Sequence, residues 1–251
     1  MTENTSGTEL AGKVALITGS SSGIGEQTAR RLSALGASVV VNSASSVTAG
    51  QAVSDSLPGP SIYVQADISD QAAGQSLLDA TIAEYGQLDI LINNAGWTTL
   101  VAHNKLDDLT DEIFRKTFEV NVFGTWWLTK AAIPLLRDSD DGQVIFITSV
   151  AGVRPVGSSM AYSMTKATLN QMTRLLAKSY GPIRFNAVAP GLVETPWTQD
   201  WAAQHAGVAA MAPLKRSATP DDCAEGVLAL IRNKYTTGQI VVIDGGLTLV
   251  S

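Results

Sequence analysis

Short apolar runs alternate with longer segments of helical period along most of the chain. The runs are rich in β-branched residues and apolar at nearly every position, which is typical of strands buried on both faces of a parallel sheet. Seven runs are predicted to be strands, at residues 14–18, 39–42, 62–66, 90–92, 144–148, 183–187 and 240–243. Because strands and helices alternate, we expect an α/β fold, namely a doubly wound three-layer sandwich around a seven-stranded parallel sheet.

The chain shows no division into separate domains. With 251 residues, of which 45% are hydrophobic, it can bury a sizeable core. It has no internal repeat or low-complexity tract, and the Gly/Pro/Ser-rich stretch at 155–159 is too short to act as a linker. We therefore expect a flexible polar N-terminus over residues 1–10 and a single domain over residues 11–251.

The predicted helix at residues 111–136 is unusual because its apolar side chains point in nearly every direction. These side chains are Ile113, Phe114, Phe118, Val122, Phe123, Trp126, Trp127, Leu128 and Ile133. One face of a sheet cannot cover all of them, so we expect the helix to pack on the sheet and also on a partner subunit, in a homo-oligomer such as a dimer or tetramer. Coverage by the chain's own loops is the alternative.

Composition excludes several classes of function. The net charge of −6 leaves no large positive field to attract nucleic acid or an anionic membrane, and we expect neither as a partner. The first eleven residues are polar and no apolar stretch reaches transmembrane length, so we expect a cytoplasmic protein. One cysteine, Cys223, and two histidines without a His-Glu-x-x-His pattern argue against a catalytic metal site.

A glycine cluster follows the first predicted strand directly and precedes a helical segment. It reads Thr18-Gly19-Ser20-Ser21-Ser22-Gly23-Ile24-Gly25. Glycines in such a turn let backbone N–H groups approach a pyrophosphate, whose charge then lies at the positive end of the helix dipole. The cluster favours dinucleotide binding, although a tight strand-to-helix connection also contains glycines. It lacks Gly-Lys-Ser/Thr, which argues against a nucleoside triphosphatase loop.

Together with further motifs in the same order, this cluster resembles that of the short-chain dehydrogenase/reductase family. The further motifs are Asp67-Ile68, Asn93-Asn94-Ala95-Gly96, Asn121, Ser149, Tyr162-Ser163-Met164-Thr165-Lys166 and Pro190-Gly191-Leu192-Val193-Glu194-Thr195. The resemblance covers about residues 11–250. It implies a Rossmann-like fold in which residues 11–251 form one NAD(P)-binding catalytic domain.

The resemblance also implies which residues bind the cofactor. Asp67 would meet the adenine, residues 94–96 would line the adenosine ribose and stabilise the sheet, and Val193 and Thr195 would hold the nicotinamide carboxamide. The full predicted set is Gly19, Ser20, Ser22, Gly23, Ile24, Gly25, Asn42, Ser43, Ala44, Asp67, Ile68, Asn94, Ala95, Gly96, Tyr162, Lys166, Pro190, Gly191, Val193 and Thr195.

The choice between the two nicotinamide cofactors depends on the end of the second strand. An acidic residue there would accept hydrogen bonds from a free 2′-hydroxyl and repel a 2′-phosphate. The chain reads Val41-Asn42-Ser43-Ala44-Ser45-Ser46 and has no carboxylate. We therefore favour NADP(H), with Ser43, Ser45 and Ser46 as candidate phosphate donors. NAD(H) stays open because the confirming arginine or lysine is also missing.

Three residues form the predicted catalytic group. Tyr162 and Lys166 lie four residues apart and project from one face of a helix. Ser149 follows the fifth strand at the carboxyl edge of the sheet, where ligands bind in open α/β folds, although a cap or turn serine is its alternative. Reduction of a carbonyl requires a proton donor, and a tyrosine becomes a usable base only beside positive charge. We predict Tyr162 as the acid–base residue, Lys166 as the group that lowers its pKa and binds the nicotinamide ribose, and Ser149 as the donor that polarises the substrate oxygen.

By resemblance, Asn121 joins a proton relay through water and Lys166. A helix asparagine with a local backbone bond is the alternative. Two connections, at residues 180–184 and 233–238, are shorter than the family's usual ones and are expected to alter surface loops rather than chemistry.

Apolar and aromatic residues are expected to line the substrate pocket. They are Trp97, Ala151, Leu192, Trp197 and Trp201. They favour an apolar small-molecule ketone or alcohol whose identity the sequence leaves open. Within the family, a 3-oxoacyl-(acyl-carrier-protein) reductase is the alternative. A non-catalytic dinucleotide-binding sensor or scaffold is less favoured, because it would not need Ser149, Tyr162 and Lys166.

Overall fold

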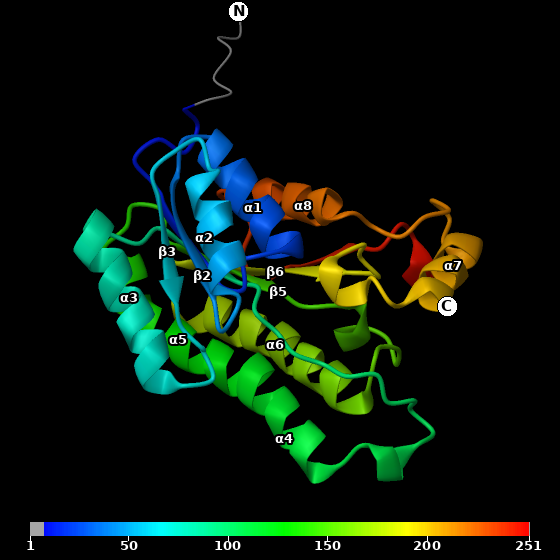
Figure 1. Cartoon of the computed structure of the whole chain (residues 1–251). Helices are drawn as coiled ribbons and strands as arrows, with labels where there is room; N and C mark the ends of the chain where they lie inside the picture. Colours follow the sequence, from blue (N-terminus) through cyan, green and yellow to red (C-terminus); the bar gives the residue numbers. More distant parts are fainter. Residues whose placement is uncertain (1–7, 251) are drawn as a thin grey trace, which may run out of the picture.

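The computed structural model describes residues 8–250, and its centre is a seven-stranded sheet (Figure 1). The strands lie in the order β3-β2-β1-β4-β5-β6-β7, and every neighbouring pair is parallel. Their bounds are β1 Val14–Ile17, β2 Ser38–Ser43, β3 Ser61–Gln65, β4 Ile90–Asn93, β5 Gln143–Ile147, β6 Arg184–Pro190 and β7 Ile240–Ile243. The predicted doubly wound α/β sandwich is therefore confirmed.

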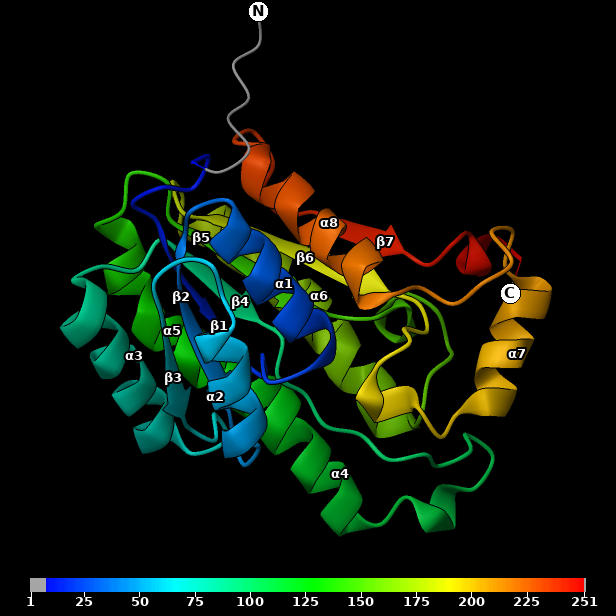
Figure 2. The same ribbon diagram turned by 45° about the horizontal axis from the view of Figure 1, so that its top comes forward.

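Helices cover both faces of the sheet and complete the three layers (Figures 1 and 2). Their bounds are α1 Gly23–Ala34, α2 Val47–Asp55, α3 Gln71–Tyr85, α4 Asp111–Phe118, α5 Thr125–Arg137, α6 Met160–Ser179, α7 Ala202–Met211 and α8 Pro220–Arg232. One half of the core packs the sheet against α1, α2 and α8, and the other packs it against α3, α5 and α6. Within residues 8–250, no helix is both long enough and apolar enough to cross a bilayer.

All seven strands lie where the apolar runs predict them, and the differences are confined to strand ends. The largest difference is in β6, predicted at 183–187 and observed at Arg184–Pro190. The added residues are buried and pair with β7 up to the partners Pro190 and Ile243. Pro190, which has no N–H for the ladder, is the last residue of the strand.

The predicted flexible N-terminus falls largely on residues 1–7, which lie outside the described part of the chain. Among the described residues, Leu10 is buried and its N–H donates to the Leu35 carbonyl over 2.8 Å. Glu9 forms an ion pair with Arg232. Packing against the rest of the protein therefore begins before residue 11.

The helix predicted at 111–136 is not regular throughout. A π-helical segment, η2 (Glu119–Gly124), joins α4 to α5. The sequence pattern did not indicate this irregularity, because apolar residues occupy nearly every direction of the segment and hide a local change of period. π-helical segments are rare and frequently lie at functional sites. This one contains Asn121.

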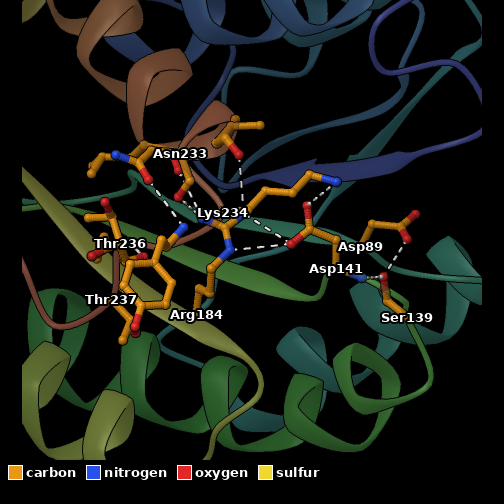
Figure 3. Close-up of polar contacts among 12 residues, drawn as sticks. Asp89, Ser139, Asp141, Arg184, Asn233, Lys234, Thr236 and Thr237 are labelled. Atoms are coloured by element: carbon orange, nitrogen blue, oxygen red, sulfur yellow. Dashed lines mark hydrogen bonds and ion pairs between the residues drawn. The ribbon is translucent and has the colours of Figure 1, made fainter.

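The two short connections meet at the amino edge of the sheet, where a polar network anchors them (Figure 3). Arg184 is buried and donates to the carbonyls of Leu230, Ile231 and Asn233 at the end of α8. It also pairs with Asp141 over 3.2 Å. A cation suits the negative end of a helix dipole, so this network stabilises α8 at the edge opposite to the carboxyl ends of the strands.

Candidate active site

The predicted motifs meet at the carboxyl edge of the sheet. The glycine cluster follows β1, residues 94–96 follow β4, Ser149 lies just beyond β5 and Gly191 follows β6. These four strands are neighbours, and chain connections leave β1 and β4 toward opposite sides of the sheet. Such a switch point is where ligands bind in open α/β folds.

The glycine cluster folds back tightly on the segment after β4. Gly19 has a φ of +62°, and a Cβ there would lie 2.9 Å from the Ala95 Cα. A Cβ at Gly25 would lie 2.5 Å from the Asn94 Nδ2. Neither glycine position has room for a side chain, and the turn leads directly into the N-terminus of α1. This geometry fits a pyrophosphate bound by main-chain N–H groups.

Asn94 stabilises the turn through its side-chain amide. Its Nδ2 donates to the carbonyls of Thr18 and Gly19, both over 2.9 Å. The Thr18 Oγ1 accepts in return from the N–H groups of Asn94 and Ala95. The amide of Asn94 therefore stabilises the loop that would hold the cofactor.

Two predicted cofactor residues, Ser20 and Asn42, have side chains that are occupied inside the protein. The Ser20 Oγ donates to the Ile17 carbonyl and accepts from the Asn42 N–H. The Asn42 Nδ2 donates to the carbonyls of Val64 and Ala66, and its Oδ1 accepts from the Gly19 N–H. Both side chains are buried and shape the site rather than reach into it.

The rim of the predicted adenosine site contains exposed and buried residues. Ser22, Ala44 and Asp67 are exposed, and the Asp67 Oδ1 accepts from the N–H and the hydroxyl of Ser69. Ser43 is buried, and its Oγ lies 2.8 Å from the Tyr63 Oη. Sequence reasoning missed Tyr63; an aromatic residue on the strand next to the end of β2 was the available signal. Ile68, also predicted here, is buried against the backbone near Gly124.

The predicted catalytic residues come together. Ser159 caps α6 by accepting from the Tyr162 N–H, which places Tyr162 in the first turn and Lys166 one turn later. The buried Lys166 Nζ donates to the Ile147 carbonyl over 2.8 Å and lies 5.5 Å from the centre of the Tyr162 ring. Ser149 is near enough to Tyr162 to affect its pKa, and its Oγ accepts from the Ala151 N–H to cap a short 3₁₀ turn, η3 (Val150–Gly152).

Burial controls the protonation of this group. It raises the pKa of Tyr162 to about 12, and the nearby Ser149 hydroxyl opposes the rise only in part. It lowers the pKa of Lys166 to about 8, so the ammonium form still predominates at pH 7. With this protein's own groups alone, Tyr162 therefore keeps its proton at neutral pH. It is prepared to act as an acid and needs further positive charge nearby to act as a base.

Asn121 is fully buried, and its side chain binds the substrate side of the site rather than Lys166. Its Oδ1 accepts from the Trp97 N–H over 2.7 Å, and its Nδ2 donates to the Trp97 carbonyl and to the Thr165 Oγ1. The side chain thus fixes Trp97 relative to η2 and α6. Both hydrogen-bonding ends of the amide are engaged, so a relay through Asn121 would have to use its main chain.

Trp197, a predicted pocket residue, lies beside Tyr162. Trp197 approaches the Tyr162 ring edge-on, with centres 6.3 Å apart, and 48% of its surface is exposed. The Lys116 Nζ lies 4.6 Å from the centre of the Trp97 ring. A Cβ at Gly96 would lie within 4 Å of Asn121, Lys166 and Trp197, so Gly96 marks their meeting point.

The remaining predicted residues lie at the margin of this group. Ala151 is a buried residue of η3, and Leu192 is half-buried beyond β6. Thr195 contacts the glycine loop, because a Cβ at Gly23 would lie 3.1 Å from the Thr195 Cγ2. Val193 is buried, and Trp201 caps α7 further along the chain.

The chain is similar to known proteins over nearly its whole length. A family model described as enoyl-(acyl carrier protein) reductase matches residues 19–248. A granaticin polyketide synthase putative ketoacyl reductase 2 of Streptomyces violaceoruber is 48% identical over 239 residues, which cover 93% of this chain and 95% of that protein.

Two solved structures have closely similar folds. A 3-ketoacyl-(acyl-carrier-protein) reductase from Brucella melitensis complexed with NADH is 30% identical, with a TM-score of 0.89, and 95% of this chain and 99% of that chain are covered. A short chain dehydrogenase from Burkholderia cenocepacia J2315 in complex with NADP is 32% identical, also with a TM-score of 0.89, and 96% and 100% are covered.

Proposed function

Because this chain belongs to the short-chain dehydrogenase/reductase family of NAD(P)(H)-dependent oxidoreductases, which interconvert carbonyl and hydroxyl groups, we propose that it is a ketone reductase with Tyr162 as its acid–base residue. The observation that carries this proposal is the placement of Ser149, Tyr162 and Lys166 together beside the glycine loop. In the same proposal, the residues of the loop, Asp67, residues 94–96 and the Val193–Thr195 stretch hold the cofactor.

Each catalytic residue handles the substrate oxygen or its proton. The Ser149 hydroxyl donates to the carbonyl oxygen, and the Tyr162 hydroxyl gives that oxygen its proton as the carbon is reduced. The Lys166 ammonium stabilises the phenolate that remains. The bound nicotinamide supplies the hydride and, once oxidised, a positive charge. Lys166 also binds the ribose, which makes it a positioning group as well as an electrostatic one.

We favour NADP(H) as the cofactor because no carboxylate stands at the end of β2 to repel a 2′-phosphate. Ser43, Ser45 and Ser46 are the polar groups there. Replacing Ser43 with aspartate should lower kcat/KM for NADPH by about 10- to 100-fold relative to NADH, since the added negative charge at the end of β2 would repel the 2′-phosphate that we place there.

Initial rates with both cofactors test this preference. Ser43→Asn is the matched control, because it adds similar volume without charge and should keep the preference for NADPH. An unchanged ratio of the two efficiencies in Ser43→Asp would contradict the placement of the phosphate at this position.

The substrate we propose is a β-ketoacyl thioester with an apolar acyl chain. Trp197 provides an apolar wall beside Tyr162, and the similar proteins from S. violaceoruber and B. melitensis are named as ketoacyl reductases. A simple apolar ketone without a thioester is the second candidate. Reductase activity measured with three substrates distinguishes these cases. The substrates are a short thioester, the same acyl group on an acyl carrier protein, and a cyclic ketone.

A panel of carbonyl and alcohol substrates, run with both cofactors in both directions, tests the proposed function. We expect NADPH oxidation with at least one ketone. Tight cofactor binding without any oxidation across the panel would favour a non-catalytic sensor or scaffold instead.

We also propose that the protein assembles as a homo-oligomer, a dimer or tetramer, and that it acts in the cytoplasm. Phe123 and Trp126 lie on the outer side of η2 and α5, exposed to 43% and 39%. Large exposed aromatic side chains on one helix indicate a contact surface. Trp126→Glu should lower the assembled mass in light scattering, because a charge would be placed in the contact. A wild-type monomer at micromolar concentration would contradict the proposal.

A further inference from the structure

Residues 194–217 form most of the long connection between β6 and α8, and we call them the covering segment. Its two ends meet in a bridge between Val193 and Ala218, with the Glu194 N–H donating to the Ala218 carbonyl over 2.8 Å and the Ala218 N–H donating to the Leu192 carbonyl over 2.9 Å. Between them lie a 3₁₀ turn, η4 (Pro196–Thr198), and α7. The segment brings Trp197 against Tyr162, so its position affects the substrate site directly.

Apolar burial contributes little to holding α7 in place. Figure 2 shows α7 at the margin of the molecule, beyond the end of the sheet. None of its ten residues is buried, its last residue Met211 is exposed, and so is Leu214 just beyond it. A helix with so few buried contacts opens at low free energy unless polar contacts hold it.

One side chain supplies such contacts from both of its ring nitrogens. The His205 Nδ1 lies 2.7 Å from the Ser217 Oγ, and its Nε2 lies 3.2 Å from both the carbonyl oxygen and the Oγ1 of Thr198. Because the Thr198 carbonyl can only accept, the Nε2 carries the proton and the Nδ1 accepts from the Ser217 hydroxyl. Ser217 and Thr198 are both buried. The imidazole thus joins the first turn of the covering segment to its last residues.

Thr198 links His205 to the residues predicted to contact the cofactor. Its Oγ1 donates to the Val193 carbonyl over 2.5 Å and lies 3.3 Å from the Thr195 N–H, which donates to it. Val193 and Thr195 are the residues proposed to hold the nicotinamide carboxamide, and Trp197 stands between them and His205 in the chain. His205 is therefore linked to both the cofactor side and the substrate side of the site without touching either.

We propose that His205 is a positioning residue that holds the covering segment over the site and thereby sets the affinity for substrate. The kinetic consequence rests on the proposed function. His205 acts through Thr198 and Ser217, takes no part in proton transfer and leaves the chemical step at Tyr162 unchanged once substrate is bound.

Hydrogen exchange tests the structural half of the proposal without any activity. His205→Ala should speed exchange of the backbone amides in residues 196–217 by about tenfold, while the amides of the sheet keep their wild-type rates. Alanine favours helix more than histidine does, so a faster rate cannot come from helix propensity. Gln204→Ala, an exposed position on the same helix, is the matched control and should leave exchange unchanged.

Steady-state kinetics test the proposed effect of His205 on the affinity for substrate. His205→Ala should raise KM for the ketone by about tenfold with kcat within about twofold of wild type. His205→Gln can still reach Thr198 and His205→Asn can still reach Ser217, so each should raise KM less than His205→Ala does.

The outcomes separate the two proposals. A wild-type protein without reductase activity would overturn the proposed function, while faster exchange in His205→Ala would still support the positioning role. An active wild type whose exchange and KM are both unchanged in His205→Ala would overturn the positioning role alone. A fall in kcat at unchanged KM would also overturn it, because His205 would then act in the chemical step.

Discussion

Tyr162→Phe is expected to lower kcat by about 10²- to 10⁴-fold, the range that a positioned general acid contributes. The substitution removes only the hydroxyl, so the ring keeps its edge-on contact with Trp197. Because Tyr162 keeps its proton at neutral pH, with a pKa raised to about 12 by burial, the loss should be seen in ketone reduction and not only in alcohol oxidation.

Cofactor binding provides the control for this variant. NADPH fluorescence titration should give a dissociation constant within a few-fold of wild type, since Lys166 and the glycine loop are unchanged. Reductase activity retained at the wild-type level would refute the assignment of Tyr162 as the acid.

Lys166→Met is expected to abolish measurable turnover and at the same time to stabilise the fold at neutral pH. Activity falls because the ammonium group beside Tyr162 and the proposed contact with the ribose are both lost. Stability rises because burial lowers the pKa of Lys166 from 10.5 to about 8, so the folded protein carries the charged form at a cost of at most about 3 kcal/mol. The lost hydrogen bond to the Ile147 carbonyl offsets part of the gain.

The pH dependence of this gain identifies its cause. Between about pH 8 and 10.5 the unfolded wild-type chain holds a proton on Lys166 that the folded chain has released, so the stability of the wild type rises with pH across this window. The advantage of Lys166→Met in thermal melting should therefore be a few degrees at pH 7 and shrink toward pH 10. Readings stay below pH 10, because the raised pKa of Tyr162 makes folded stability fall with pH above that point. A variant less stable than wild type at pH 7 would contradict this account.

Much of the fold could be predicted from the sequence because the central strands β2, β1, β4, β5 and β6 are buried on both faces and read as nearly continuous apolar runs. The strand at Ile240–Ile243 agrees at both ends. The catalytic pair could be predicted for an equally local reason, since a spacing of four residues on a helix fixes that Tyr162 and Lys166 share a face. Parallel strands then bring Ser149 to the same edge.

What the sequence could not indicate depends on side chains that are distant in the chain or on local changes of helix geometry. Asn42 looks like a cofactor ligand by its position, yet its amide is bonded to main-chain groups of the glycine loop, of β3 and of the residue after β3. Asn121 binds Trp97 because η2 turns it toward the pocket wall. The bridge from His205 to Ser217 joins residues twelve apart across a loop whose path no pattern specifies.

The measurement that tests the central claim most directly traces the hydride with a deuterium label and tests the proton donor with Tyr162→Phe. The wild type and Tyr162→Phe are each incubated with a β-keto thioester and NADPH deuterated at either face of C4, and the product is analysed by mass spectrometry. The proposed mechanism predicts a secondary alcohol labelled at its carbinol carbon with one of the two cofactors in the wild type, and almost no alcohol in Tyr162→Phe. An unlabelled alcohol with both cofactors, or equal amounts of labelled alcohol from the two proteins, would contradict it.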